Sequence, residues 1–135
     1  MSTCQRILYV EDEPDIQTVA KLALEMVGGF TVKTCSSGEE ALDEAADFMP
    51  DLILLDVMMP GMDGPTTFNR FREQPIAAKI PIVFMTAKIQ PSEIAYYKSL
   101  GAIDVIAKPF DPMTLADQIR IIWEKREQNV HFQAM

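Results

Sequence analysis

The sequence alternates between two kinds of apolar pattern, and this alternation constrains the fold more than any other feature. Short segments typical of β-strands, at residues 6–10, 30–35, 52–55, 82–85 and 104–107, are followed by segments with helical spacing. The helices should begin near Pro14, Ser36 or Ser37, Pro65, Pro91 and Asp111. Such an alternation favours right-handed crossovers. The sequence therefore predicts an α/β fold, a doubly wound five-stranded parallel sheet with helices on both faces.

The ends of the predicted helices follow from local signals. The first helix should end at Gly28-Gly29. Its inward face is predicted to carry Ile16, Val19, Ala20, Ala23, Leu24 and Val27. After Lys125 the apolar pattern gives way to polar residues that include His131. We therefore predict one domain over residues 1–126 and a polar C-terminal tail over residues 127–135, with no separate output domain.

Composition excludes several classes of function. The 135 residues carry a net charge of −8, which disfavours direct binding to nucleic acid. No apolar stretch reaches the roughly 20 residues that a membrane-spanning helix needs, and no signal peptide precedes the first strand, so we expect a cytoplasmic protein. Cys4 and Cys35 should lie at opposite edges of the sheet, which argues against a disulfide. With one histidine and two cysteines, any metal site must use oxygen ligands.

Polar side chains stand at the carboxyl ends of four predicted strands. Glu11 and Asp12 follow the first strand, Asp56 the third, Thr86 the fourth and Lys108 the fifth. In an open parallel sheet these ends share one edge, which is where α/β proteins bind their ligands. We therefore expect the five side chains to meet.

These residue types permit phosphoryl transfer. Clustered carboxylates of Glu11, Asp12 and Asp56 should repel one another and have raised pKa values, a cost that a divalent cation relieves. Magnesium suits such a site, with the backbone carbonyl of Met58 as a further candidate ligand. Asp56 is then a candidate nucleophile toward phosphorus, since carboxylates form aspartyl-phosphates. Lys108 and the Thr86 hydroxyl would contact the phosphoryl oxygens.

Each of these residues alone also has a simpler structural interpretation. An acidic pair such as Glu11-Asp12 is common at a helix N-terminus, and an aspartate such as Asp56 can cap a turn. Thr86 would be an ordinary strand-end threonine, and Lys108 a solvated lysine. Their joint occurrence at successive strand ends favours a functional site.

In this order, the segments Glu11-Asp12, Asp56 to Gly64, Thr86-Ala87 and Lys108-Pro109-Phe110 resemble the receiver (phosphoacceptor) domain of two-component response regulators. The resemblance covers nearly the whole chain. It implies a flavodoxin-like sheet in the order 2-1-3-4-5. It also implies a cis peptide bond between Lys108 and Pro109.

The resemblance further implies a role for each site residue. Asp56 would accept a phosphoryl group from a sensor histidine kinase or a histidine phosphotransfer protein. Asp12 and Asp56 would bind Mg²⁺ directly, and Glu11 would do so through water. Lys108 would pair with the phosphoryl group, and Thr86 would move toward it. The change would reach a downstream protein through the face formed by the fourth helix, the fifth strand and the fifth helix.

One position departs from the family pattern. Many receivers carry a switching tyrosine or phenylalanine on the fifth strand, where this chain has Val105. The signal would then pass through the backbone or through repacking of the fourth helix, and Tyr96 and Tyr97 are the candidate replacements. Met58 and Lys88 flank the site and are expected to tune the lifetime of the phosphoryl group.

Two other functions compete with a phosphorylation-activated switch. A haloacid-dehalogenase-type phosphatase resembles this site but expects a second aspartate two residues after the nucleophile, where this chain has Met58. A receiver-like interaction module that is never phosphorylated would have no use for clustered carboxylates. We therefore predict a stand-alone switch, not a turnover enzyme, that is a monomer or a phosphorylation-dependent dimer.

Overall fold

A computed structural model describes residues 3–134 of the chain, with side-chain surroundings as far as Arg126. Its centre is a five-stranded sheet in the order β2-β1-β3-β4-β5, with every neighbouring pair parallel. The strands are β1 (Arg6–Val10), β2 (Thr31–Cys35), β3 (Leu52–Asp56), β4 (Ile82–Thr86) and β5 (Asp104–Ala107). The predicted α/β class, strand number and strand order are confirmed.

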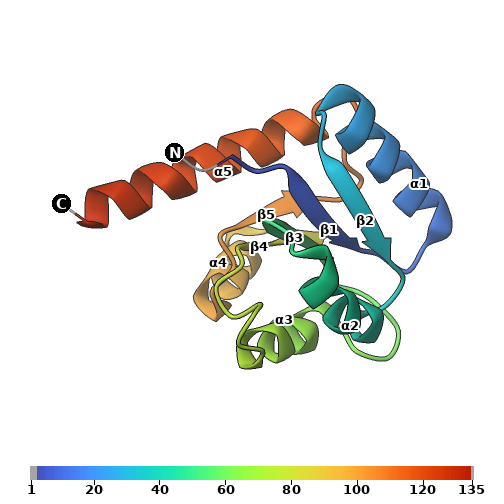
Figure 1. The fold of residues 1–135 in the computed structure, drawn as a ribbon, viewed down its shortest axis with the longest axis horizontal. Helices are drawn as coiled ribbons and strands as arrows, with labels where there is room; N and C mark the ends of the chain where they lie inside the picture. Colours follow the sequence, from blue (N-terminus) through green and yellow to red (C-terminus); the bar gives the residue numbers. More distant parts are fainter. Residues whose placement is uncertain (1–2, 135) are drawn as a thin grey trace.

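Helices cover both faces of this sheet. They are α1 (Pro14–Leu22), the π-helical turn η1 (Ala23–Val27), α2 (Gly38–Phe48), α3 (Gly64–Glu73), α4 (Pro91–Leu100) and α5 (Leu115–Ala134). Figure 1 shows α1 and α5 on one side of the sheet and α2, α3 and α4 on the other. This is the doubly wound arrangement that the β-α alternation predicts.

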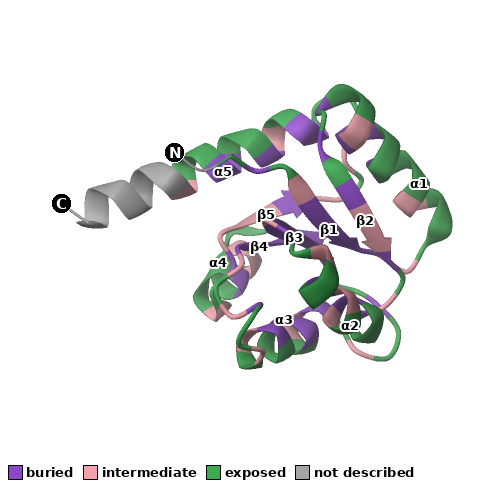
Figure 2. Cartoon of the chain, viewed as in Figure 1, coloured by how far each residue is buried: buried purple, intermediate pink, exposed green. Residues whose placement is uncertain are grey.

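The core lies in two layers, one on each side of the sheet. The layer under α1 and α5 includes Tyr9, Leu24 and Ile119, and the layer under α2, α3 and α4 includes Phe68, Phe84 and Tyr97. Every residue of β3 and β4 is buried. Figure 2 shows buried residues in the sheet and exposed residues on the outer sides of the helices. The almost purely apolar central strands therefore reflect burial on both faces.

Side-chain caps fix where two helices begin. The Ser37 hydroxyl accepts a hydrogen bond from the Glu40 N–H at 3.1 Å, and the Glu40 carboxylate accepts one from the Ser36 N–H at 2.8 Å. Of the two serines that the sequence offered as caps for α2, the structure thus selects Ser37. Asp63 caps α3 in the same way, because its carboxylate accepts the Thr66 N–H at 2.9 Å.

The predicted inward face of the first helix is partly wrong. Ala20, Ala23 and Leu24 are buried as predicted, but Val19 is 44% exposed and Val27 is 51% exposed. Val27 is the last residue of η1. A π-helical turn holds more residues than an α-helical turn, so Val27 is rotated off the inward face. Val19 instead borders a surface hollow described below.

The last helix begins later than predicted. Residues 111–114 form a turn in which the Asp111 carboxylate accepts the Met113 N–H at 2.9 Å, and α5 starts only at Leu115. The predicted polar tail over residues 127–135 has a helical backbone as far as Ala134, while its side chains and Met135 lie outside the described part of the chain. Cys4 and Cys35 are both free, as predicted, and both are buried. Among the described residues, no helix combines the length and hydrophobicity needed to span a membrane.

Candidate functional site

The register of the sheet brings the predicted site residues to one edge. Asp56 is aligned with Met85, so that Thr86 lies one residue further along the neighbouring strand, and Thr86 is in turn aligned with Ala107, which precedes Lys108. On the other side of β3, Val10 is aligned with Leu55 and is followed by Glu11. The expected meeting of strand ends is thus present in the structure.

Three carboxylates form the acidic part of the site. Glu11 and Asp56 are buried and Asp12 is half-buried, and one oxygen from each lies within 4.8 Å of the others. These are hard oxygen ligands with three potential negative charges, and hard divalent cations such as magnesium prefer such ligands. The residues present therefore fit the predicted ion.

Lys108 connects two of these carboxylates. Its ammonium donates to Glu11 Oε1 at 2.9 Å and to Asp56 Oδ2 at 3.2 Å, and its side chain is 19% exposed. The Tyr9 hydroxyl and the Glu13 N–H also donate to Glu11, at 3.2 Å and 3.3 Å. Three donors therefore hydrogen-bond to Glu11, whereas within the described part of the chain the Asp56 carboxylate accepts from Lys108 and from the Met58 N–H, the latter at 3.4 Å.

This difference separates the pKa values of the two buried carboxyls. Burial and the charge of Glu11 raise the pKa of Asp56 to about 6, against the opposing effect of Lys108. Burial also acts to raise the pKa of Glu11, but hydrogen bonds from Lys108 and Glu13 outweigh it, and the net pKa is lowered. The predicted rise is therefore confirmed for Asp56 and wrong for Glu11. Lys108, although burial alone would lower its pKa, has a raised pKa because of Glu11 and Asp56.

The loop after β3 folds back against Asp56. The Gly64 N–H donates to the Val57 carbonyl at 2.9 Å, and a Cβ atom at Gly64 would lie 2.6 Å from the Asp56 carbonyl oxygen. Only glycine allows this approach, which explains the glycine that ends the Asp56 to Gly64 segment. The Met58 side chain is exposed beside the site. The use of the Met58 carbonyl as a metal ligand stays a prediction.

Thr86 is buried at the end of β4, and its hydroxyl already has partners. The Thr86 hydroxyl oxygen accepts the Lys88 N–H at 3.0 Å. It also interacts with the Tyr97 side chain: burial raises the pKa of Tyr97, and the hydrogen bond with Thr86 opposes that rise. Ala87, which follows Thr86, is exposed and small.

Two residues at the site were not singled out from the sequence. Tyr9 donates to the Glu11 carboxylate, and the Gln17 side-chain amide donates to the Glu11 carbonyl and to the Ser36 hydroxyl. A signal existed for Tyr9, since residues two apart on a strand share a face and Tyr9 is two residues before Glu11. No comparable signal in the sequence points to Gln17, because it reaches the site from α1 across the loop that follows β1.

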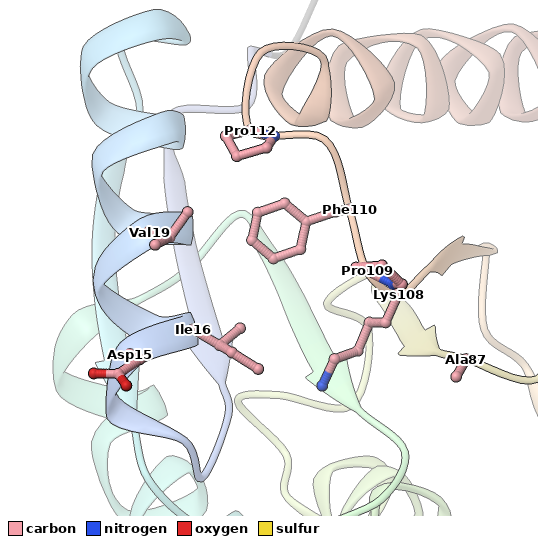
Figure 3. Close-up of a pocket in the computed structure, with 8 residues that line it drawn as sticks. All are labelled: Asp15, Ile16, Val19, Ala87, Lys108, Pro109, Phe110 and Pro112. Carbon is pink, nitrogen blue, oxygen red and sulfur yellow. The ribbon is translucent and has the colours of Figure 1, made fainter.

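A surface hollow of about 430 Å³ adjoins the site. Figure 3 shows it between α1 and the segment that follows β5, with the Lys108 side chain extending toward the sheet edge. Its lining is largely apolar and consists of Asp15, Ile16, Val19, Ala87, Lys108, Pro109, Phe110 and Pro112. An apolar hollow next to a cluster of buried carboxylates suits the docking of another molecule.

The comparisons with known proteins agree with this geometry. Residues 7–120 match the family model of the response regulator receiver domain. The chain belongs to this family. It is 38% identical over 123 residues to the alkaline phosphatase synthesis transcriptional regulatory protein PhoP of Bacillus subtilis, covering 91% of this chain and 50% of PhoP. The probable transcriptional regulator ycf27 of Guillardia theta is 36% identical, with 90% of this chain and 46% of that protein covered.

Solved receiver structures have the same fold as this receiver domain. The chemotaxis response regulator CheY4 of Vibrio cholerae superimposes with a TM-score of 0.81 at 31% identity, covering 89% of this chain and 99% of CheY4. The peptide bond between Lys108 and Pro109 is cis, as the resemblance implied. This receiver chain spans about half the length of the curated relatives named above.

Proposed function

We propose that this receiver domain is a phosphorylation-activated switch of a two-component or phosphorelay system, with Asp56 as the phosphoacceptor. The observation that carries the proposal is the placement of Asp56. Its buried carboxylate lies at a strand end, 3.2 Å from the Lys108 ammonium and within reach of two further carboxylates. This combination supplies a nucleophile, a fixed cation and a place for a metal ion.

The transfer step follows from these positions. A carboxylate oxygen of Asp56 forms a bond to phosphorus while the phosphorus–nitrogen bond of a phosphohistidine breaks, and the electron pair returns to the imidazole nitrogen. The Lys108 ammonium can exchange its hydrogen bond to Asp56 Oδ2 for one to a phosphoryl oxygen, while its hydrogen bond to Glu11 keeps it in position. The Thr86 hydroxyl is the second donor from the protein. Asp12 and Asp56 would hold a magnesium ion, with Glu11 assisting through water and the Met58 carbonyl as a further ligand, and the ion would supply positive charge to the phosphoryl oxygens.

A phosphatase is less well supported by the same site. Such an enzyme needs an acid near the leaving group, and the second residue after Asp56 is the exposed, apolar Met58. Without that acid the aspartyl-phosphate should persist. Receiver domains are signalling domains, and we infer that this one is a switch and not a turnover enzyme.

The partner that supplies the phosphoryl group should dock over the hollow of Figure 3. Its apolar lining from Ile16, Val19 and Phe110 lies beside Lys108, so a protein seated there brings a phosphohistidine toward Asp56. We propose a sensor histidine kinase or a histidine phosphotransfer protein in this role. The output would be a change in the α4-β5-α5 face that a downstream protein binds.

Intact mass after incubation with Mg²⁺ and acetyl phosphate tests the phosphoacceptor. We expect the parent to gain one phosphoryl group only when magnesium is present, and Asp56→Asn to gain none. Asp47→Asn is the matched control, because Asp47 is an exposed carboxylate on α2, and it should behave as the parent. Equal phosphorylation of Asp56→Asn and parent would show that another residue is the nucleophile. If no variant gains mass, beryllofluoride binding separates a receiver that needs its kinase from a module that is never phosphorylated.

A further inference from the structure

The position where many receivers carry an aromatic switch residue is occupied by Val105. Val105 is half-buried on β5, aligned with Phe84 of β4 and packed against the core layer under α4. A valine has no ring or hydroxyl with which to respond to Thr86. If this domain switches as proposed above, the movement of Thr86 has to reach α4 through the backbone or through another side chain.

Tyr97 occupies the place that such a residue requires. Phe84 and Thr86 are two residues apart on β4 and thus face the same side of the sheet, toward α4. The Tyr97 ring packs on Phe84 with 5.2 Å between ring centroids, and its hydroxyl interacts with the Thr86 hydroxyl. Tyr97 is only 7% exposed. The Tyr97 ring thus packs against Phe84, while the Tyr97 hydroxyl contacts the hydroxyl of Thr86.

Aromatic contacts continue from Tyr97 in both directions. The ring centroids of Phe84 and Phe68 of α3 are 5.6 Å apart, and those of Tyr97 and Tyr96 are 5.4 Å apart. Tyr96 is 53% exposed on the outer side of α4. A displacement of Tyr97 would therefore change what α4 presents to solvent, because interdigitated rings do not deform independently.

The Thr86 hydroxyl has a single proton, which it can donate to only one acceptor at a time. The Thr86 oxygen already accepts the Lys88 N–H at 3.0 Å. The Thr86 proton can thus point to the Tyr97 oxygen or to a phosphoryl oxygen on Asp56, but not to both. We propose that Tyr97 is a positioning residue for Thr86, which holds the Thr86 hydroxyl toward α4 before phosphorylation and is released when Thr86 turns to the phosphoryl group. This inference rests on the proposed function of Asp56.

NMR of protein labelled with ¹³C in its tyrosine rings tests the coupling, with beryllofluoride and Mg²⁺ as the probe. The chain has three tyrosines, and they report on different places. Tyr9 contacts Glu11 and reports on occupancy of the site, whereas Tyr97 reports on the proposed coupling. We expect both signals to shift in the parent. In Thr86→Ala the Tyr9 signal should still shift while the Tyr97 response is lost, and Thr86→Ser should restore it.

Removing only the Tyr97 hydroxyl gives the complementary measurement. Tyr97→Phe keeps the ring on Phe84 and frees the Thr86 proton, so beryllofluoride should bind about fivefold more tightly, the factor expected for a net hydrogen bond of about 1 kcal/mol. Tyr96→Phe, which removes an exposed hydroxyl from the neighbouring residue, should leave the affinity unchanged.

Four results would overturn the inference. A Tyr97 response that persists in Thr86→Ala would show that Thr86 does not drive it, and equal affinities for Tyr97→Phe and Tyr96→Phe would show that the hydroxyl does not compete. A Tyr97 signal that stays still while Tyr9 shifts would refute the coupling alone. If the Tyr9 signal also stays still, the site does not bind the phosphoryl mimic, and the proposed function fails together with this inference.

Discussion

At the scale of single residues, the site combines one carboxyl that is stabilised as an anion and one that is not. Glu11 has a lowered pKa because Lys108 and the Glu13 N–H donate to it, while Asp56 has a pKa raised to about 6 by burial and by the charge of Glu11. At neutral pH the metal-free protein therefore holds an ionised Asp56 at a cost in folding free energy. A bound cation relieves this repulsion.

Asp56→Asn should stabilise the metal-free protein at neutral pH, because it removes that repulsion and leaves the Glu11–Lys108 ion pair. In the parent, folding raises the pKa of Asp56 from 3.8 to about 6, so the folded state favours the protonated carboxyl. This contribution to the free energy of unfolding is complete below pH 3.8, the pKa in the unfolded chain, and is lost as pH rises through about 6. Parent and variant should thus have similar stability near pH 4 and differ by about 1 to 3 kcal/mol at pH 7.5. Urea unfolding without magnesium measures this difference. A variant less stable than the parent at pH 7.5 would contradict it.

At the scale of elements, the loop between β3 and α3 depends on close backbone contact. A Cβ at Gly64 would meet backbone atoms, 2.6 Å from the Asp56 carbonyl oxygen and 2.8 Å from Val57 Cα. Gly61 differs. Its φ of +76° favours glycine, but a Cβ atom at Gly61 would have none of the described atoms outside its own chain neighbours within 4 Å. The two glycines of one loop thus serve different purposes, one a close approach and the other a backbone conformation.

Gly64→Ala should therefore cost more than Gly61→Ala. We expect about 2 to 3 kcal/mol for Gly64→Ala, since backbone must shift to admit the methyl group, and about 1 kcal/mol for Gly61→Ala from the left-handed conformation. Gly64→Ala should also slow phosphorylation by acetyl phosphate, because the shift displaces Asp56. Chemical denaturation and the rate of mass gain measure the two effects. Equal costs for both variants would rule out the steric explanation.

At the scale of the whole molecule, the sequence predicted the elements that depend on local pattern. All five strands lie where the short segments typical of β-strands indicated, within one residue at either end. The strand-end residues Glu11, Asp56 and Lys108 meet as expected. The features that the sequence left undetermined depend on contacts between distant segments. The lowered pKa of Glu11 depends on Lys108, 97 residues away. The rotation of Val27 depends on a π-helical turn, and the meeting of Tyr97 with Thr86 depends on how α4 packs on β4.

The acidic cluster couples metal binding to the stability of the whole domain. A ligand that binds only the folded state stabilises it by RT ln(1 + [L]/Kd), so magnesium should raise the melting temperature as its concentration rises. The effect should weaken as pH falls through about 6, because protons then compete for Asp56, whose pKa is raised to about 6. Thermal unfolding with 0 and about 10 mM Mg²⁺, a concentration chosen so that ligand exceeds a weak Kd, measures the shift at pH 5 and pH 7.5. Asp56→Asn should lose most of it, and Asp47→Asn, with an exposed carboxylate on α2, should retain it. A magnesium effect of equal size in Asp56→Asn would mean that the ion binds away from the cluster of Glu11, Asp12 and Asp56.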